Sequence, residues 1–374
     1  MNTRPLSILA LSFVLGACAA APRGGTPAPG AGRDVRLAVV DQARWSMSAH
    51  NMQPWEVVLD PDDSLAFRVH IAGVRLLPQA DPPSRQTLMS IGGFLAVAED
   101  AAAAEGYRTR IDLFPEGEPA ADDLGKGFTA PVAVVHLQPA PGSPAPGNLD
   151  ALGGATVKAG LGQLALAARQ QADLRQVNSF PGIAVDFFTD EQTLARLKPL
   201  LKEAFRLEMT HLPTLEESYT LMRRNARQIA RTPWGLSYRS SFPRKSLGAI
   251  QFFETLFPMK PAKWGPAGAN SFDREIDSAR TFVLIRTSGN RRAAQVEAGM
   301  VFQRMWLRAV HDGLAVLPAS QPLQEYPAMA DLYRSIHEGF AGAGETIQMI
   351  AAIGVASPGF AAGFRIPTDG LVRP

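Results

Sequence analysis

Residues 48–55, with the sequence SAHNMQPW, form the most specific arrangement of polar side chains in this chain. They follow a stretch with helical spacing of apolar residues, 34–47, so they stand at the end of a predicted helix. A serine hydroxyl and an asparagine amide each donate and accept hydrogen bonds, so Ser48 and Asn51 could satisfy the polar edge of a flat heterocycle. Pro54 would fix the exit of the loop. The alternative is a polar loop whose only task is to cap the helix.

Outside this loop the sequence offers no second group of catalytic or metal-binding residues. His211, His311 and His337 are scattered over helical segments without the spacing of metal ligands, so we expect structural roles and no bound metal. There is no phosphate-binding glycine loop, no HExxH and no nucleophile elbow. The 37 basic and 35 acidic residues give a formal net charge of +2, which argues against nucleic acid as a partner.

The N-terminus has the features of an export signal. Residues 1–4 are short and positively charged, and residues 6–15 are apolar but too few to span a bilayer. The following LGAC, residues 15–18, resembles a bacterial lipobox, in which the cysteine is acylated and becomes the first mature residue. Cys18 is the only cysteine of the chain, so it has no partner for a disulfide or a metal site.

These features predict a lipoprotein-type signal peptide over 1–18, with Cys18 as the lipidated residue, and a flexible linker over 19–33. The linker is small, proline- and glycine-rich, and cannot build a core. The mature protein is then expected on the periplasmic side, lipid-anchored to the outer membrane if the host is Gram-negative. Ordinary cleavage after Ala20 or Ala21 is the alternative.

From Asp34 onward the sequence has the patterning of a folded domain. Spacing of apolar residues and apolar or alternating runs predict its helices and strands. Helices are expected at 34–47, 85–106, 156–173, 190–211, 214–231, 246–257 and 292–312, and strands at 55–59, 66–71, 108–114, 131–137, 281–287 and 347–356. Residues 139–147, PAPGSPAPG, are a linker by composition.

Two of the long helical stretches look like copies of each other. Each has an early glycine, a late alanine and a terminal glycine, followed by an extended run. Because glycine ends many helices, the terminal match alone is weak, but three matches at one offset indicate an internal duplication. A shift of 207 residues, the difference between 92 and 299, places Gly92 on Gly299, Ala102 on Ala309 and Gly106 on Gly313.

The SAHNMQPW stretch resembles the serine, asparagine, glutamine, proline, tryptophan signature of the nitroreductase superfamily. It resembles most closely the Acg-like branch, which has a histidine before the asparagine. Three further blocks resemble the family, namely 76–93 (LLPQADPPSRQTLMSIGG), 217–229 (ESYTLMRRNARQI) and 299–323, which ends in GLAVLPASQPL. Together the blocks extend over about residues 35–356, nearly the whole mature chain.

The resemblance implies an α+β, nitroreductase-like fold with a central, mostly antiparallel sheet wrapped by helices. Ordinary members are homodimers with FMN at the subunit interface, and in the tandem branch two degenerate repeats of one chain form a pseudo-dimer. We therefore expect a first repeat over 34–140 and a second over 150–374, with a helical, lid-like insertion at about 190–260. Such a chain would be a monomer or a loose dimer.

The resemblance also implies which residues bind FMN. The loop at 48–53 would supply hydroxyl, imidazole and amide groups to the flavin, although the imidazole could instead donate to a backbone carbonyl. The loop after the second long helix would aim a backbone N–H at flavin N5. Two arginines would hold the phosphate or form surface ion pairs. The candidate cofactor-binding residues are Ser48, His50, Asn51, Gln53, Arg85, Arg223, Ala319 and Ser320.

A protein of this type is expected to be an FMN-dependent oxidoreductase. Hydride would pass by a ping-pong route from NAD(P)H through flavin to a nitro-compound, a quinone or a similar small acceptor. The alternative is an exported flavin-binding or cofactor-free, non-enzymatic descendant with an occluded pocket. Two departures favour it: no arginine precedes Gly354 in the last predicted strand, and FMN and nicotinamide are scarce outside the cytoplasm. The membrane would be contacted through the lipid anchor only.

Overall fold

The computed structural model describes residues 34–120, 123–126, 128–142, 147–153, 161–238, 244–356 and 363–373. Helices and strands are mixed along this part of the chain, as expected for an α+β fold, and Asp34–Pro374 form a compact unit of their own. The predicted signal peptide, Cys18 and the predicted linker at 19–33 lie outside the described residues. Residues 143–146 of the linker at 139–147 also lie outside them.

The first sheet comes mainly from the N-terminal part of the unit. Its strand order is β10-β1-β2-β4-β3, antiparallel except where β10 runs parallel to β1. Burial alternates along its strands, so one face packs on the core and the other is partly exposed. The strands are β1 (Trp55–Leu59), β2 (Ala66–Ile71), β3 (Tyr107–Leu113), β4 (Ala133–Pro139) and β10 (Val372–Arg373).

The second sheet comes from the C-terminal part and is antiparallel throughout. The order runs β5-β9-β7-β6, and β8 also pairs with β9. Residues of β7 and β9 are buried on both faces, which explains why TFVLIRT reads as a continuous apolar run. The strands are β5 (Leu161–Gly162), β6 (Ile183–Phe188), β7 (Thr281–Ser288), β8 (Leu314–Pro318) and β9 (Glu345–Ala356).

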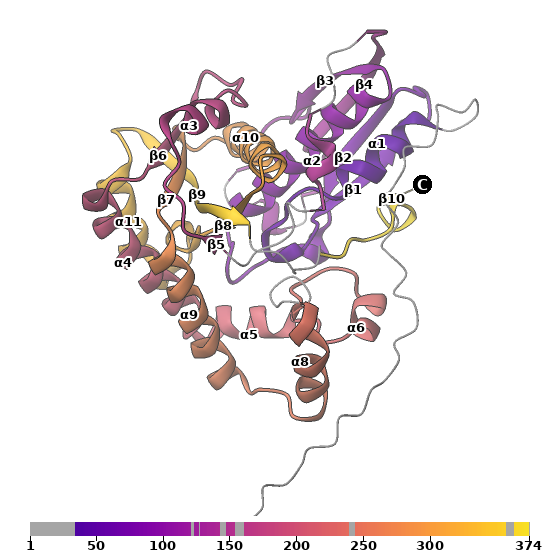
Figure 1. The fold of residues 1–374 in the computed structure, drawn as a ribbon. Coiled ribbons are helices and arrows are strands. Elements are labelled where there is room, and N and C mark those ends of the chain that lie inside the picture. Colours follow the sequence, from indigo (N-terminus) through magenta and orange to yellow (C-terminus); the bar gives the residue numbers. More distant parts are fainter. Residues whose placement is uncertain are drawn as a thin grey trace, which may run out of the picture. The chain divides into compact units, whose positions relative to one another are not determined.

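The two sheets share one strand order. The path β1-β2-β4-β3 in the first corresponds to β6-β7-β9-β8 in the second. In both, a long helix joins the second strand of the path to the last one: α2 (Arg85–Ala104) between β2 and β3, and α10 (Arg292–His311) between β7 and β8 (Figure 1). Helices α2 and α10 begin 207 residues apart, and so do β3 and β8. We call 34–140 the first half and 150–374 the second half.

Helices α2 and α10 pack against each other through glycine, at the first pair of residues that the 207-residue offset matches. A Cβ atom on Gly92 would lie 1.9 Å from the carbonyl oxygen of Val296, and one on Gly299 would lie 2.1 Å from that of Met89. The contact is reciprocal, because Met89 and Val296 are themselves 207 residues apart. By length and composition α2 is the one described helix that could cross a membrane, but it is mostly buried in this core.

The largest hydrophobic cluster fills the space between the two sheets around α2 and α10. Helix α1 (Val35–Ala43) packs beside α2, and α3 (Ala168–Arg175) packs beside α10. A second cluster joins the outer face of the second sheet to α4 (Glu191–Glu208), α9 (Pro261–Ser278) and α11 (Ala330–Phe340). The second sheet is therefore covered on both faces, whereas the first is covered on one.

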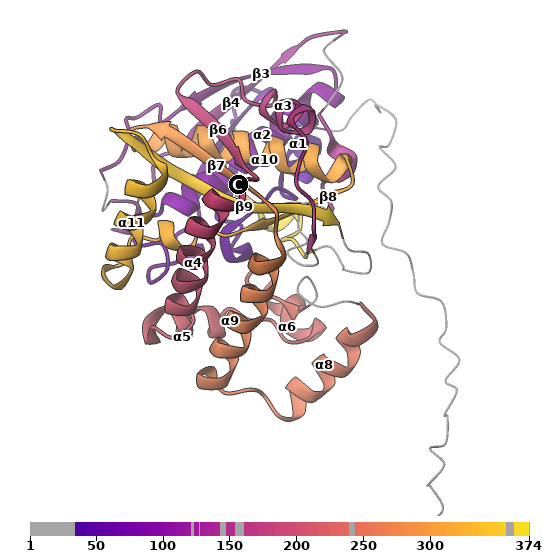
Figure 2. The same ribbon diagram turned by 60° about the vertical axis from the view of Figure 1, so that its left-hand side comes forward.

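The helical insertion lies between β6 and β7 and is longer than the sequence indicates. It holds α4, α5 (Leu212–Thr220), α6 (Ala226–Arg231), α8 (Arg244–Leu256) and α9, so its helices continue to Ser278 (Figure 2). Helix α9 contains Pro266 and two glycines, Gly265 and Gly268, whose low helix propensity explains why the sequence pattern does not predict this helix. Gly265 lets α9 approach the C-terminal end of α4 closely, because a Cβ atom on Gly265 would lie 2.1 Å from the carbonyl oxygen of Met209.

Two predicted helices differ from the structure. The helix predicted at 214–231 is wrong, because α5 ends at Thr220 and the side chain of Asn225 caps a new helix, α6. The helix predicted at 156–173 is wrong in its described part, where Leu161–Gly162 pair with β9 before α3 begins. The other predicted helices and strands occur within a few residues of their expected bounds.

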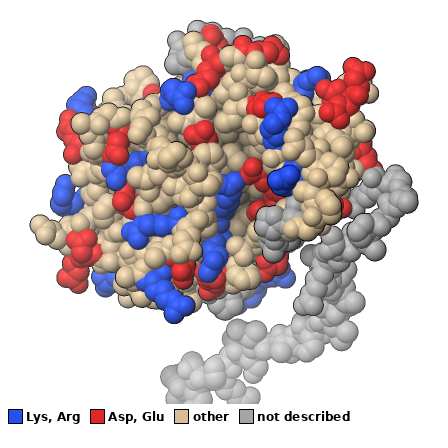
Figure 3. All heavy atoms as spheres, turned by 90° about the horizontal axis from the view of Figure 1, so that it is seen from above, with Lys and Arg blue, Asp and Glu red and all other residues tan. Residues whose placement is uncertain are grey.

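On the face of the molecule seen in Figure 3, acidic and basic side chains are interspersed.

Candidate functional site

A cavity of about 910 Å³ lies where the loop 48–51 of the first half meets the loop 317–321 of the second. Helices of the insertion and the C-terminal residues 363–365 complete its wall. Both loops that the sequence singles out thus face one shared space. Most of the lining is apolar and polarisable, which suits a flat organic ligand. Its larger apolar members include Met47, Met89, Phe205, Met209, Met222, Phe253, Phe302 and Trp306.

The loop that bears the SAHNMQPW sequence has a strained backbone. His50, Asn51 and Gln53 have φ angles of 47°, 56° and 51°, in the left-handed region that residues with a Cβ atom rarely adopt. Such conformations cost about 1 kcal/mol or more each and persist only where the surroundings impose them. Here the Gln53 N–H donates to Ser48 Oγ at 2.7 Å, and the Met47 N–H donates to Gln303 Oε1 of α10 at 2.6 Å.

Asn51 and Gln53 tie the loop to distant parts of the chain. The Asn51 amide donates to Gly235 O at 3.1 Å and its Oδ1 accepts from Arg365 at 2.7 Å. Gln53 is fully buried: its amide donates to the Pro233 carbonyl at 2.8 Å and accepts from the Ile366 N–H at 2.7 Å. Asn51 lines the cavity and Gln53 does not. Gln53 therefore holds the loop in place rather than facing a ligand.

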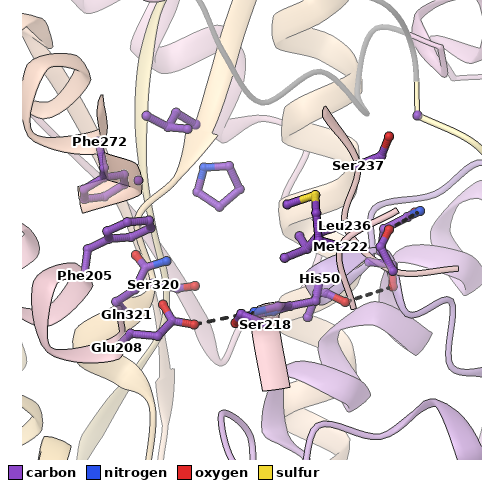
Figure 4. Close-up of a pocket in the computed structure, with 18 of the residues that line it drawn as sticks. His50, Phe205, Glu208, Ser218, Met222, Leu236, Ser237, Phe272, Ser320 and Gln321 are labelled. Atoms are coloured by element: carbon purple, nitrogen blue, oxygen red, sulfur yellow. Dashed lines mark hydrogen bonds and ion pairs between the residues drawn. The ribbon is translucent and has the colours of Figure 1, made fainter. Parts of the chain in front are cut away.

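His50 points at two groups of the insertion. Its Nε2 lies 3.1 Å from Ser218 Oγ and 3.5 Å from Glu208 Oε1, and all three residues line the cavity (Figure 4). Glu208 is buried, and its Oε1 has no hydrogen-bond partner among the described residues. Glu217 faces the same cluster, and burial raises its pKa. Figure 4 shows Phe205, Phe272 and Gln321 across the cavity from Met222 and Leu236.

Arg365 is a buried cation on the cavity wall that the sequence did not reveal. Its guanidinium donates to Asn51 Oδ1, to Phe364 O at 2.9 Å and to Ser46 O at 2.8 Å, and stacks over Trp45. No carboxylate among the described residues pairs with it, and burial together with nearby Arg44 lowers its pKa to about 9. A buried charge without a counter-ion is costly, so this position suits an anionic ligand group.

Several buried polar atoms on the wall lack a hydrogen-bond partner within the described part of the chain. Such orphaned groups are rare in native proteins and point to a ligand or water that completes their hydrogen bonds. Both donors and acceptors are present, as the polar edge of a heterocycle requires. The donors are Gln86 Nε2, Trp306 Nε1 and Arg365 Nε, and the acceptors are Gln321 Oε1, Gln324 Oε1 and Glu208 Oε1.

The structure brings together only some of the predicted site residues. Ser48, His50, Asn51 and Ser320 line the cavity, whereas Gln53, Ala319, Arg85 and Arg223 do not. The Ala319 N–H donates to the Ile350 carbonyl at 2.8 Å, within the sheet.

The two predicted arginines have protein partners. Arg85 is buried and donates to the Gln348 and Leu323 carbonyls at 2.5 and 3.0 Å. Arg223 donates to the carbonyls of Thr220 and Thr232. Gln86, the neighbour of Arg85, lines the cavity instead, because adjacent residues of a helix point about 100° apart.

No protein-family model matches the chain, and a search of curated proteins finds no significant match. Solved structures do resemble it. An FMN- and NADPH-dependent nitroreductase from Sphigopyxis sp. strain HMH is 17% identical over 60% of this chain and 97% of that one, with a TM-score of 0.37. A nitroreductase with bound FMN from Bacteroides fragilis is 10% identical over 61% and 97%, with a TM-score of 0.34. A candidate nitroreductase from Anabaena variabilis is 12% identical over 86% and 88%, with a TM-score of 0.36. Identities and TM-scores this low do not assign a function to the chain.

Proposed function

We propose that this protein is an FMN-dependent oxidoreductase of the nitroreductase type. The observation that supports this most strongly is the convergence of the 48–51 and 317–321 loops on one apolar cavity with unpartnered polar atoms. The resemblance of SAHNMQPW to the nitroreductase signature indicates FMN as the cofactor. The two halves have the same strand order, which suggests a pseudo-dimer with the site inside a single chain. The chain would then work as a monomer or a loose dimer.

The residues present fit FMN. A volume of about 910 Å³ lies in the range of cofactor pockets, about 300–1,000 Å³. The unpaired amides of Gln86, Gln321 and Gln324 offer one donor and two acceptors to the polar edge of the ring. Arg365 offers a desolvated positive charge to the phosphate, a task that the sequence assigned to Arg85 and Arg223. Methionine and aromatic side chains would cover the apolar end of the ring.

When bound, FMN would supply two-electron redox chemistry, accepting hydride from NAD(P)H and passing it to a nitro-compound, a quinone or a similar acceptor. The protein would orient the partners and keep water out. His50 would hold a proton at Nε2 beside the reacting groups, positioned by Ser218 and backed by the Glu208 carboxylate. The nicotinamide and the acceptor would use the same cavity in turn, which gives ping-pong kinetics.

The test is the absorption spectrum of the purified protein and an FMN titration followed by fluorescence quenching. We expect flavin bands and tight binding in the wild type. Arg365→Met should weaken FMN binding by about tenfold or more, because a charge-assisted contact is lost. Arg365→Lys, which keeps the charge, should recover part of the affinity. Arg223→Met, outside the cavity, is the matched control and should bind FMN as the wild type does.

If the wild type binds no FMN, the oxidoreductase proposal fails and a cofactor-free role replaces it. If Arg223→Met loses affinity and Arg365→Met does not, FMN binds but its phosphate lies elsewhere.

We also propose that the chain is exported and lipid-anchored through Cys18, on the evidence of its LGAC motif. Cys18→Ser should release the protein from the membrane fraction of the producing cells. Wild-type protein in the soluble periplasmic fraction would contradict the anchor and favour ordinary cleavage.

A further inference from the structure

Helix α8 of the insertion presents an apolar surface that no described residue covers. We call Phe252, Phe253, Leu256, Phe257 and Met259 the apolar tip. Its two most exposed members are Phe253 and Phe257, at 62% and 75%. None of the α8 residues is buried. Large exposed apolar residues elsewhere in the described chain, such as Val74, Leu212 and Val355, are widely separated in sequence, so the tip is exceptional.

The exposed charges of residues 244–263, the segment that carries the tip, are basic. Arg244 and Lys245 begin α8, and Lys260 and Lys263 follow the tip, all exposed. The one acidic residue of this stretch, Glu254, is mostly buried and turns inward to Arg224 at 3.8 Å. An apolar helix face with aromatic residues and a basic rim is the composition of helices that lie in the interface of an anionic bilayer. The rim thus favours a lipid surface over a second copy of this chain, which would bring the same positive charge.

The tip is continuous with the cavity. Ile250, Phe253 and Met259 line the cavity, while Phe252 and Phe257 do not. The same short segment therefore forms part of the cavity wall on one side and the exposed surface on the other. A lipid-soluble molecule could pass from one to the other along apolar side chains without entering water.

The predicted anchor is compatible with this contact. A weakly binding protein surface or a single lipid anchor alone gives only marginal membrane binding, but the two together give stable membrane association.

We propose that the apolar tip docks on the surface of an anionic bilayer and that the cavity takes its oxidant from that bilayer, the oxidant being a lipid-soluble quinone. The quinone part rests on the proposed function. The reaction balances as quinone plus NAD(P)H plus a proton giving hydroquinone plus NAD(P)⁺. The quinone gains two electrons and two protons, one as hydride from the nicotinamide by way of FMN and one from solvent.

The docking is tested by sedimentation with vesicles of phosphatidylglycerol and phosphatidylethanolamine. The protein is the Asp34–Pro374 unit, which holds both sheets and every described core cluster, so that no acyl chain contributes. We expect binding that weakens at high salt and falls by about tenfold or more in the Phe252→Ser/Phe257→Ser double variant. The matched control, Val74→Ser/Leu212→Ser, also removes two exposed apolar side chains and should bind as the wild type does.

Absence of vesicle binding, or equal loss in both double variants, would overturn the docking. Dimerisation that the tip variant abolishes, seen by sedimentation velocity without vesicles, would also overturn it, because the tip would then contact a second copy. FMN titration is run on each variant, and equal affinities are expected, because none of the four substituted residues lines the cavity.

The substrate class is tested with NADPH and two quinones: one with a long isoprenoid tail embedded in the vesicles, and one without a tail in water. The tip variant should reduce the tailed quinone about tenfold more slowly than the wild type and the tail-free quinone equally fast. Equal rates with the tailed quinone would overturn the delivery route. Reduction of neither quinone by an FMN-loaded wild type would overturn the quinone assignment and leave the docking to be judged by the vesicles alone.

Discussion

The connection between β1 and β2 and its counterpart between β6 and β7 differ more than any other pair of equivalent segments in the two halves. The first is residues 60–65, a tight turn in which Asp60 Oδ1 accepts the Asp62 and Asp63 N–H groups. The second is residues 189–280 and holds α4, α5, α6, α8 and α9. The strands around both connections keep the same order, so the scaffold tolerates the insertion without changing its core.

The loops that precede β1 and β6 also differ between the two halves. Residues 48–54 hold three left-handed residues, face the cavity and bond to distant segments. Residues 176–182 form a turn in which Asn178 accepts from the Phe180 N–H at 2.9 Å and donates to the Ile183 carbonyl at 2.8 Å, and none of them lines the cavity. A symmetric pair of halves would offer two equivalent sites. Here the insertion and the 48–54 loop both line a single cavity, so the helix contact is symmetric and the cavity is not.

The largest effect is expected at the symmetric contact. Gly92→Ala and Gly299→Ala each force a Cβ atom to within about 2 Å of a carbonyl oxygen of the other helix, as the 1.9 and 2.1 Å distances show. Each should lower the free energy of unfolding by about 3 kcal/mol or more, or prevent folding. Urea unfolding followed by circular dichroism measures this.

Gly248→Ala on α8 is the control, because no atom lies within 4 Å of its added Cβ atom. It should leave stability unchanged or raise it by up to about 1 kcal/mol. Similar stabilities for Gly92→Ala and Gly248→Ala would contradict the close helix contact.

The next effect concerns two arginines 207 residues apart, each of which donates to the other half. Arg85 donates to the Gln348 and Leu323 carbonyls, and Arg292 donates to Pro83 O at 2.8 Å. Arg85→Met and Arg292→Met should each lower the free energy of unfolding by about 2–4 kcal/mol, because buried carbonyls lose their partners. FMN affinity should stay within about threefold of the wild type. If Arg85→Met stays folded and loses FMN, Arg85 binds the phosphate as the sequence predicted.

A smaller effect is expected from substitutions in the 48–54 and 176–182 loops, of which only the first should change FMN affinity. Asn51→Leu removes the amide that joins the loop to Gly235 and Arg365, and should weaken FMN binding by about 1–3 kcal/mol, measured by fluorescence titration. Asn178→Leu breaks the corresponding turn in the second half and should lower stability by about 1 kcal/mol with FMN affinity unchanged. Equal FMN affinities for all three proteins would contradict the assignment of the site to the first loop.

The smallest effect distinguishes the two long helices by their pH dependence. At the 207-residue offset, Asp100 of α2 corresponds to the buried Leu307 of α10. Burial raises the pKa of Asp100 to about 6. The folded carboxyl holds its proton more tightly than the unfolded one, whose pKa is about 4. The free energy of unfolding should therefore fall as pH rises from about 4 through 6, by about 1–2 kcal/mol.

Asp100→Asn should remove its share of this fall and make the protein more stable at pH 7, whereas the share of Asp81, whose pKa burial also raises to about 6, should stay. Urea unfolding at pH 4, 5, 6 and 7 tests it, and an unchanged slope would show that another group is responsible.

The repeated scaffold could be predicted from the sequence. Strands β1, β2 and β7 follow from period-two alternation or continuous apolar runs, which are local consequences of which faces are buried. The 207-residue offset identified Gly92 and Gly299 because the other helix approaches closely at both positions, so both halves need a glycine there. The loop 48–55 was found because its polar residues follow a helix directly.

The set of polar groups that line the cavity could not be predicted in this way, because it depends on how distant segments pack. Arg365 and Gln324 come from segments far from residue 48, and nothing local in the sequence shows that they point at it. Arg85 and Gln86 are neighbours, yet one donates to buried carbonyls and the other lines the cavity, because one step along a helix turns the side chain by about 100°. The direction of a side chain is fixed by packing against distant partners, so no pattern of neighbouring residues contains it.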